Sequence, residues 1–205
     1  QQKKIGSQVS QLLQLHIEEW IAKIHFPKNM RWGSYKMKFV RPIRWIVSMW
    51  NKDLIPVKLE MLESGTKTQG HRFLSPEMTL LKDAADYKKQ LEKLNVMVDF
   101  EERRDSIIKQ IKLLEREYSF VVELDNYLLD EVTNLVEWPT VILGEFEEEF
   151  LELPEPVLVT SMAVNQRYFP VFKKKQKQKI DKKKLLPFFV TVRNGNKKNI
   201  DIVRR

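Results

Sequence analysis

The sequence predicts an α+β fold, in which a mixed, largely antiparallel sheet packs against several helices. Some segments repeat apolar residues every three or four positions, which is typical of amphipathic helices, and others alternate apolar and polar residues, which is typical of strands. The two kinds of segment do not alternate strictly, so a parallel fold built from βαβ units is not favoured. Hydrophobic residues make up 42% of the 205 positions, a share that supplies a core and excludes a wholly disordered chain.

The amino-terminal part predicts one helix followed by an interrupted strand. Residues 9–24 carry apolar side chains at helical spacing, and Pro27 ends this helix. Apolar and polar residues then alternate over 35–49, with a break at Arg41-Pro42. Because proline cannot donate a ladder hydrogen bond, the break indicates an edge strand or a bulge.

Two more strands are expected after this one. Residues 51–53 form a turn signal before a strand over 54–62, and Ser64-Gly65 leads into another over 66–74. Short connections of this kind join neighbouring antiparallel strands. We therefore expect three antiparallel strands in this part of the chain.

Aspartates mark the starts of the next three predicted helices. Asp83 precedes a helix that extends through residue 94, and Asp99 precedes a long one to about residue 117. Glu102 follows Asp99 at the capping-box spacing, which strengthens this helix start. A strand over 120–124 comes next, and Asp125 then starts a helix that Trp138-Pro139 closes.

The last predicted elements are a buried strand, a helix and a hairpin. The strand covers 141–144, and Pro156 suits the first position of a helix over 157–165. The hairpin has its arms at 167–172 and 185–193, joined by a lysine-rich loop over 173–184.

These elements suggest three sections of chain. We expect an N-terminal helical segment at 1–25, an α+β domain at 26–195 that carries the lysine-rich loop, and a terminal stretch at 196–205. The chain starts without Met, so we expect it to be a fragment of a longer protein. It has no apolar run of the ~18 to 20 residues that span a bilayer, and no signal peptide is visible, so no membrane contact is expected.

Charge is concentrated in two segments. Residues 173–184 contain eight lysines and one aspartate, so +7 of the formal net charge of +8 lies there. Residues 144–156 contain six glutamates. The lysine run is either a solvated hairpin tip or a contact for nucleic-acid phosphates.

The sequence carries no recognisable catalytic motif and no metal-ligand motif. Cys is absent, the three histidines are far apart, and six glycines form no phosphate-binding loop. We therefore expect no catalytic residue and no metal site in this chain. His71, next to Arg72, is the most suggestive histidine, with structural, RNA-binding and catalytic roles as alternatives.

Tryptophans and arginines gather in the strand-rich part of the chain. Trp32, Trp45 and Trp50, with Trp138 further along, are either base-stacking platforms or core residues, and we expect Trp45 to point inward. Arginine suits planar, bidentate partners, so these residues bind phosphates or form internal salt bridges with glutamates. The arginines concerned are Arg31, Arg41, Arg44, Arg72 and Arg167.

Several collinear blocks together resemble one known family, the bacterial glycyl-tRNA synthetase β subunit. The blocks are 26–33 (FPKNMRWG), 41–45 (RPIRW), 70–73 (GHRF), 98–104 (VDFEERR), 131–139 (EVTNLVEWP), 149–154 (EFLELP), and 160–162 (TSM) with 166–170 (QRYFP). Their order and spacing match along roughly positions 20 to 195. One departure is Ala163-Val164-Asn165, where the family often has a basic residue and a His.

The resemblance implies a piece from the amino-terminal half of a larger subunit, in a cytoplasmic α2β2 enzyme that attaches glycine to tRNA(Gly). In that family the class II active site, which uses ATP and Mg²⁺, lies on the α subunit, and the β subunit binds tRNA. The implied partners are the α subunit, the remainder of the β subunit and tRNA(Gly). A similarity to the B3/B4 module of phenylalanyl-tRNA synthetase β subunits is also expected. The candidate tRNA-binding residues are Arg31, His71, Arg72, Arg167, Lys173, Lys174, Lys175 and Lys177.

Two alternatives to tRNA contact remain at this point. The chain could be an assembly module that docks the α subunit or the rest of the β subunit. The docking surface would be the glutamate-rich stretch at 144–156, which we call the glutamate block, or an apolar face. The B3/B4 similarity also suggests an aminoacyl-tRNA editing domain. Physical reasoning argues against editing, because a tight pocket for glycine excludes every larger amino acid by size.

Overall fold

The computed structural model describes residues 6, 8–60, 62–174 and 184–196, which group into two compact units. Unit 1 comprises Gln1–Gly70 and Glu77–Gln90, and unit 2 comprises His71–Pro76 and Leu91–Arg205. Each unit has its own hydrophobic core, and no described core cluster draws buried residues from both. This division cuts through residues 26–195, for which the sequence suggested a single domain.

Unit 1 begins with helix α1, Val9–Lys23, as its apolar spacing predicts. One face of α1 contributes Leu13, Ile17 and Ile21 to a small core that is built on three buried residues. These three residues are Ile55, Val57 and Leu59. The helix is therefore stabilised by tertiary packing, since its N-cap residue makes no side-chain hydrogen bond.

Short strands make up the rest of unit 1. They are β1 (Met30–Arg31), β2 (Lys38–Phe39), β3 (Ile46–Val47), β4 (Met49–Trp50), β5 (Asp53–Leu54), β6 (Lys58–Leu59), β7 (Leu62–Gly65), β8 (Lys67–Gln69) and β9 (Met78–Leu80). Two-stranded antiparallel pairs form between β1 and β2, β4 and β5, and β8 and β9, and a three-stranded sheet has the order β3-β7-β6. A 3₁₀ turn, η1 (Ala84–Asp86), leads into α2 (Tyr87–Lys93).

The prediction of three antiparallel strands over 35–74 is wrong in one respect. β3 pairs with β7 in parallel, with Ile46 opposite Ser64, whereas β6 and β7 are antiparallel. The single strand expected over 54–62 is also divided, because Pro56 interrupts it and Glu60 has a left-handed backbone with φ of +53°. A turn at Glu60 reverses the chain, so β7 returns alongside β6.

Unit 2 contains a four-stranded antiparallel sheet and most of the long helices. Its elements are α3 (Phe100–Tyr118), β10 (Phe120–Val122), α4 (Asn126–Leu135), β11 (Pro139–Glu145), η2 (Glu148–Glu152), α5 (Glu155–Thr160), the π-helix η3 (Ser161–Gln166), β12 (Phe169–Lys173) and β13 (Leu185–Asn194). The strand order is β10-β12-β13-β11. The predicted hairpin is confirmed, because β12 and β13 pair as its two arms.

The three predicted helix starts are confirmed by side-chain hydrogen bonds. The carboxylate of Asp99 accepts from the backbone N–H of Glu102 over 3.2 Å, and that of Asp125 accepts from Leu128 over 2.7 Å. Asp83 accepts from the N–H of Ala85 over 3.0 Å. Each bond satisfies one of the N–H groups that the first turn of a helix leaves without a partner.

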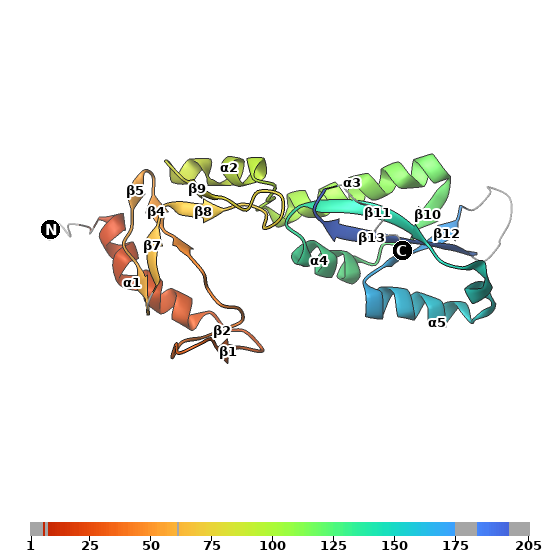
Figure 1. Cartoon of the computed structure of the whole chain (residues 1–205), viewed down its shortest axis with the longest axis horizontal. Helices are drawn as coiled ribbons and strands as arrows, with labels where there is room; N and C mark the ends of the chain where they lie inside the picture. Colours follow the sequence, from red (N-terminus) through yellow and green to blue (C-terminus); the bar gives the residue numbers. More distant parts are fainter. Residues whose placement is uncertain (1–5, 7, 61, 175–183, 197–205) are drawn as a thin grey trace, which may run out of the picture. The chain divides into compact units, whose positions relative to one another are not determined.

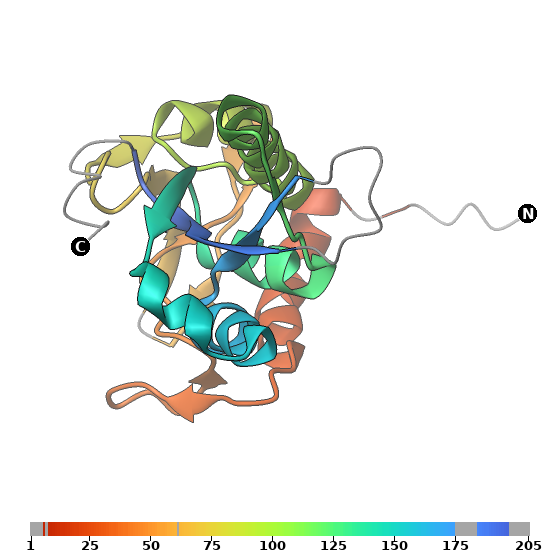
Figure 2. The ribbon, with the colours of Figure 1, turned by 90° about the vertical axis from the view of Figure 1, so that its right-hand side faces the viewer.

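Helices cover both faces of the sheet in unit 2. Val190 of β13 packs with α3 and α4, whereas its neighbour Phe189 packs with η3 and α5, as the alternation along a strand requires. Figures 1 and 2 show α3 and α5 on opposite sides of the sheet. The predicted α+β class is confirmed, while the similarity to the B3/B4 module stays a prediction. In the described part of the chain, no helix combines the length and the apolar character that a bilayer crossing requires.

Candidate nucleic-acid interface

Arg167, one of the predicted contact residues, is engaged within unit 2. It caps η3 in a left-handed backbone conformation, with φ of +60°. Its Nε atom donates to Oε1 of Glu131 on α4 over 2.9 Å, and its guanidinium also donates to the carbonyl of Val164. The structure thus favours the internal salt bridge for this arginine, although its side chain stays 41% exposed.

His71 is buried and organises a turn. Its side chain is 1% exposed, and Nδ1 accepts hydrogen bonds from the backbone N–H groups of Phe73 and Leu74, each over 3.2 Å. Nε2 is buried and has no hydrogen-bond partner among the described residues. Because an imidazole in this position cannot reach a ligand at the surface, we leave His71 out of the proposed contact surface.

Arg72 is exposed, whereas the neighbouring His71 is buried. Its guanidinium lies 5.8 Å from the ring centroid of Phe73, and that ring is 81% exposed. An exposed cation beside an exposed aromatic ring can contact a phosphate and stack a base. Arg72 therefore stays a candidate contact in unit 2.

The described end of the lysine-rich loop is exposed. Lys173 is the last residue of β12, and its backbone N–H donates to the carbonyl of Lys184 over 2.8 Å, which closes the stem of the hairpin. Lys174 follows and is also exposed. Lys175 and Lys177 lie outside the described residues, so the prediction for the loop itself stays open.

Arg31 belongs to a larger group of cations in unit 1, which we call the cationic segment. No Asp or Glu occurs between Glu19 and Asp53. The side chains of the segment are exposed, and none forms an ion pair with a residue that the structure describes. Its members are Lys28, Arg31, Lys36, Lys38, Arg41 and Arg44.

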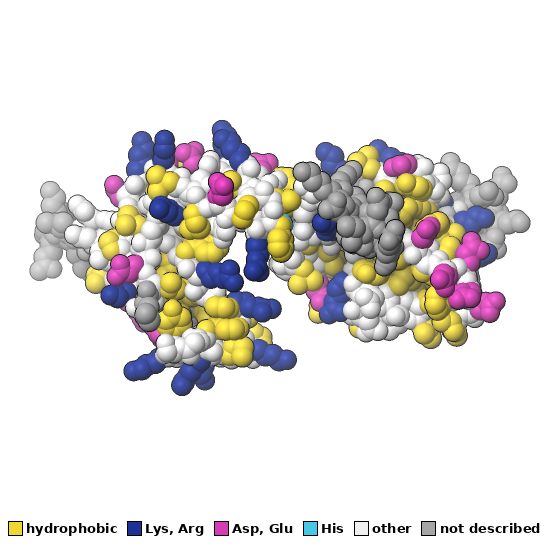
Figure 3. Space-filling view, viewed as in Figure 1, with side chains coloured by type: hydrophobic (Ala, Val, Ile, Leu, Met, Phe, Trp, Pro, Cys, Tyr) yellow, Lys and Arg dark blue, Asp and Glu magenta, His cyan; other side chains and the backbone are white. Residues whose placement is uncertain are grey.

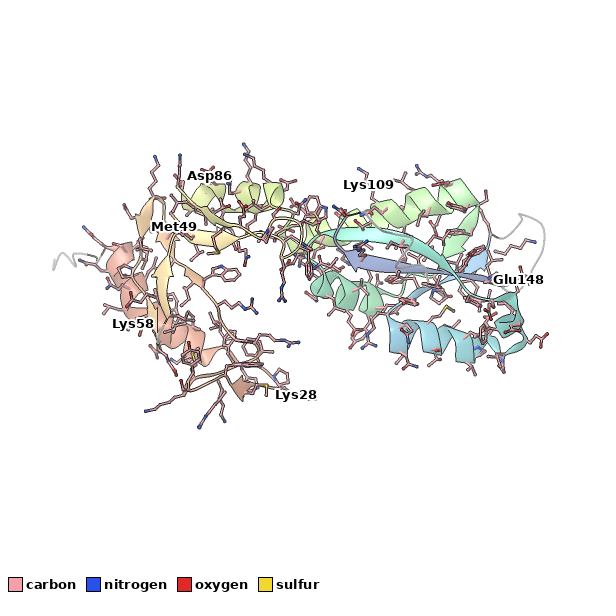
Figure 4. All side chains as sticks on the ribbon, viewed as in Figure 1. Lys28, Met49, Lys58, Asp86, Lys109 and Glu148 are labelled. Atoms are coloured by element: carbon pink, nitrogen blue, oxygen red, sulfur yellow. The ribbon has the colours of Figure 1, made fainter. Side chains whose placement is uncertain are left out.

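Apolar side chains are interleaved with these cations. Met30 is 56% exposed, Val40 is 40% exposed and Trp45 is 39% exposed. The expectation that Trp45 points into the core is wrong, because Trp45 precedes the two-residue strand β3, which lies at the edge of its three-stranded sheet, and its side chain is left partly uncovered. In Figure 3, Lys and Arg side chains gather around the β1 and β2 end of unit 1 with apolar side chains between them, and Figure 4 marks Lys28 in this group.

The backbone of the cationic segment is held by contacts of its own unit. The indole Nε1 of Trp32 donates to the carbonyl of Phe39 over 2.9 Å, across the β1 and β2 hairpin. The ring of Phe26 meets that of Phe39 edge-on, with centroids 4.9 Å apart. The carboxylate of Glu60 accepts from the backbone N–H groups of Lys36 and Met37. These contacts present the cations on an ordered loop, which lowers the entropic cost of binding.

Sequence reasoning missed the cationic segment as a unit. The lysine run at 173–184 accounts for +7 of the net charge of +8, so the rest of the chain looks neutral when it is summed as a whole. A sum over short windows would have shown it, because the stretch between Glu19 and Asp53 is entirely free of acids.

The glutamate block of unit 2 has the opposite character. η2 carries exposed glutamates, including Glu148 (Figure 4), and the neighbouring Phe150 and Leu153 are 45% and 47% exposed. The negative charge of this surface repels phosphates, whereas a protein partner can bury the exposed side chains of Phe150 and Leu153. Among the described residues there is also no cluster of three or more acidic or histidine side chains that could hold a metal ion.

Comparison with known proteins assigns the chain to a family. The family described as "Glycyl-tRNA synthetase beta subunit" matches residues 1–205, which is the entire length. The chain belongs to this family. The resemblance that the collinear sequence blocks indicated is therefore confirmed.

Curated relatives in the family are much longer than this chain. It is 43% identical over 201 residues to the glycine--tRNA ligase beta subunit of Listeria welshimeri, covering 98% of this chain and 28% of the relative. The corresponding protein of Shouchella clausii is 43% identical over 202 residues, again covering 98% of this chain and 28% of the relative. That of Bacillus subtilis is 43% identical over 204 residues, covering all of this chain and 29% of the relative. The chain thus corresponds to less than a third of a β subunit of glycine-tRNA ligase.

Proposed function

We propose that this chain is a non-catalytic part of a glycine-tRNA ligase that contacts tRNA through the cationic segment of unit 1. The observation that carries the proposal is the set of six exposed cations without ion-pair partners among the described residues. Phosphate contacts supply much of the affinity of nucleic-acid-binding proteins. Arg72 with Phe73, and the lysines at 173–177, are secondary contacts in this proposal.

The remaining partners follow from membership in the family. We place the glycine-activating site, with its ATP and Mg²⁺, on an α subunit in an α2β2 assembly, and the rest of the β subunit beside this chain. Such an enzyme works in the cytoplasm, where tRNA is charged. The family match and the absence of a recognisable catalytic motif in the sequence support this arrangement.

The salt dependence of tRNA binding tests the proposal. Filter binding of tRNA that carries a glycine anticodon should weaken as salt rises, with a slope of about 0.7 to 0.9 in log K per phosphate neutralised. The triple variant Lys28→Gln, Lys36→Gln, Lys38→Gln should lower that slope by about 2 and weaken binding roughly tenfold or more at moderate salt.

Two further variants locate the contact. Lys109→Gln, Lys112→Gln, Arg116→Gln removes the same charge from an exposed face of α3 and should leave the slope unchanged. The variant Lys173→Ala, Lys174→Ala, Lys175→Ala, Lys177→Ala measures the share of the lysine-rich loop. An unchanged slope in the unit 1 variant rejects the cationic segment as a contact, whatever the loop contributes.

A second candidate function is docking of a protein partner on unit 2. The observation that favours it is the glutamate block at 144–156, where Phe150 and Leu153 are 45% and 47% exposed, together with Val157 directly after it, which is 56% exposed. Co-purification with the α subunit should be lost in Phe150→Ser, Leu153→Ser if this surface is the docking site. Retention of tRNA binding in the same variant would separate the two functions.

A further inference from the structure

Unit 1 contains a pocket that the tRNA-contact proposal does not use. Its volume is about 390 Å³, within the range of about 300 to 1,000 Å³ that small-molecule sites occupy. Trp45, Val47 and Met49 line one side of the pocket. Tyr87, the first residue of α2, lines it together with residues of the segment before α2. Figure 4 marks Met49 on β4.

The walls of the pocket are fixed by the fold. Trp45, Val47 and Met49 occupy alternate positions, so they share one face of the extended chain. The opposite wall is joined to the strands by backbone hydrogen bonds, from Leu81 to Thr66 over 2.8 Å and from Ala84 to Asn51 over 2.7 Å. Thr68 and Leu81, each 3% exposed, are the most deeply buried lining residues. The pocket is therefore preformed.

Two aromatic side chains remain accessible in this pocket. Trp45 is 39% exposed and Tyr87 is 37% exposed. The Tyr87 hydroxyl, whose pKa partial burial raises above the ordinary value of 10.0, is protonated at neutral pH and can donate a hydrogen bond. Thr68, which also has a polar side chain, is a second residue of this kind in the lining. Rings that accept a flat partner, together with a few hydrogen-bonding groups, are what recognition of a nucleobase requires.

The position of the pocket in the sequence links it to the cationic segment. Trp45 directly follows Arg44, and Arg41 lies three residues before Arg44. We propose that this pocket accepts one unpaired nucleobase, stacked on Trp45, from the RNA whose phosphates lie on the cationic segment. The inference rests on the proposed function and adds the class of group that is bound. An apolar side chain of a protein partner is the competing occupant. Asp83 and Asp86 flank the lining residues Ala84 and Tyr87, but the chain that leads into Trp45 has no acid from residue 20 to residue 52, and this favours RNA.

A pair of short RNA probes tests the inference on the 205-residue chain. One is a nonamer of uridylate, and the other is the same ribose-phosphate chain without bases. Stacking of a base on an aromatic ring typically adds about 5- to 150-fold in affinity, so the uridylate nonamer should bind more tightly by a factor in this range. Trp45→Ala should reduce this ratio at least fivefold, and Trp45→Phe, which keeps a ring, should retain most of it.

Trp50→Ala provides the matched control. Trp50 is 46% exposed and lies on β4, yet it does not line the pocket, so its loss should leave the ratio unchanged. Circular dichroism and thermal unfolding establish that each variant is folded. If Trp45→Ala does not fold, Trp45→Phe still tests the inference. The inference is overturned if the base-free probe binds as tightly as uridylate, as expected when the pocket instead takes an apolar side chain of a protein partner. It is also overturned if Trp50→Ala and Trp45→Ala lower the ratio equally. A normal salt slope without any base preference rejects this pocket alone, whereas loss of the slope rejects the proposed function.

Discussion

The carboxylate of Glu60 accepts the backbone N–H of Met37 over 2.5 Å, and that of Lys36 over 3.0 Å. Glu60 itself sits in the left-handed turn between β6 and β7, so one residue of that turn anchors the loop between β1 and β2. The cations at positions 36 and 38 thus owe their placement to an acid far away in the sequence.

Removing this anchor should loosen the loop. In Glu60→Ala the amide protons of Lys36 and Met37 should exchange with solvent about fivefold faster, because a hydrogen bond at an exposed carboxylate contributes about 1 kcal/mol. Hydrogen exchange read by NMR measures both amides directly. Glu60→Gln keeps one carbonyl acceptor, so its exchange rates should fall between those of the wild type and of Glu60→Ala. Equal protection in all three chains would contradict the anchoring role.

Gly144 should not tolerate a side chain. A Cβ atom there would lie 2.3 Å from the tip of the Phe189 ring, which stacks on Tyr168 with centroids 4.4 Å apart. Gly144→Ala should therefore destabilise unit 2 by about 1 to 3 kcal/mol, the usual cost of overpacking. Exchange of the buried Val190 amide during urea titration reports on that unit.

A second substitution checks the cause of this effect. Phe189→Leu shortens the side chain that collides, so Gly144→Ala should cost much less in its background than in the wild-type chain. Additive losses in the double variant would show that the clash is not the reason.

His71 should contribute to stability through its turn. His71→Ala leaves the N–H groups of Phe73 and Leu74 without their acceptor and should cost about 1 to 3 kcal/mol. His71→Asn should lose less, because an asparagine side chain can accept a backbone N–H two residues further on. Chemical denaturation compares the two variants. Binding of tRNA should be the same in His71→Asn as in the wild type, and a loss of affinity in this folded variant would return His71 to the contact surface.

Tyr87 should make unit 1 sensitive to alkaline pH. Burial raises its pKa above the ordinary value of 10.0, so the folded state holds the proton more tightly than the unfolded state. Its contribution to stability is complete below pH 10, and it is lost as the pH rises through the higher pKa of the folded state. Tyr87→Phe should therefore lose less stability between pH 9 and about pH 11 than the wild type does, as urea unfolding at a series of pH values would show. Tyr127→Phe, which removes the hydroxyl of a side chain that is 80% exposed, is the matched control for this substitution.

Features that depend on neighbouring residues were predictable from the sequence. The caps at Asp99 and Asp125 act over three residues, and the helices behind them bury Ile107, Ile111 and Leu129 through repeats of three and four. The hairpin of β12 and β13 is also local, since its arms are consecutive strands.

The missed features depend on residues far apart or on very short elements. β3 has two residues, too few to show a period, and its parallel partner β7 is reached only after two reversals of the chain. The exposure of Trp45 was missed for the same reason. It lies beside this small sheet, and the alternation of residues around it does not indicate which face of the chain is covered. Of the contact residues named from the sequence, Arg31 led to the cationic segment, whereas Arg167 is paired with Glu131 and His71 is buried.

The place of β13 in the sheet sets the order in which the two units can fold during translation. β13 lies between β12 and β11, so unit 2 lacks a central strand until residue 194 has left the ribosome. The residues of unit 1 are complete a hundred positions earlier, at Gln90. While α3, α4 and β11 wait for that strand, their apolar faces are exposed to solvent, which makes the nascent chain prone to aggregation during this interval.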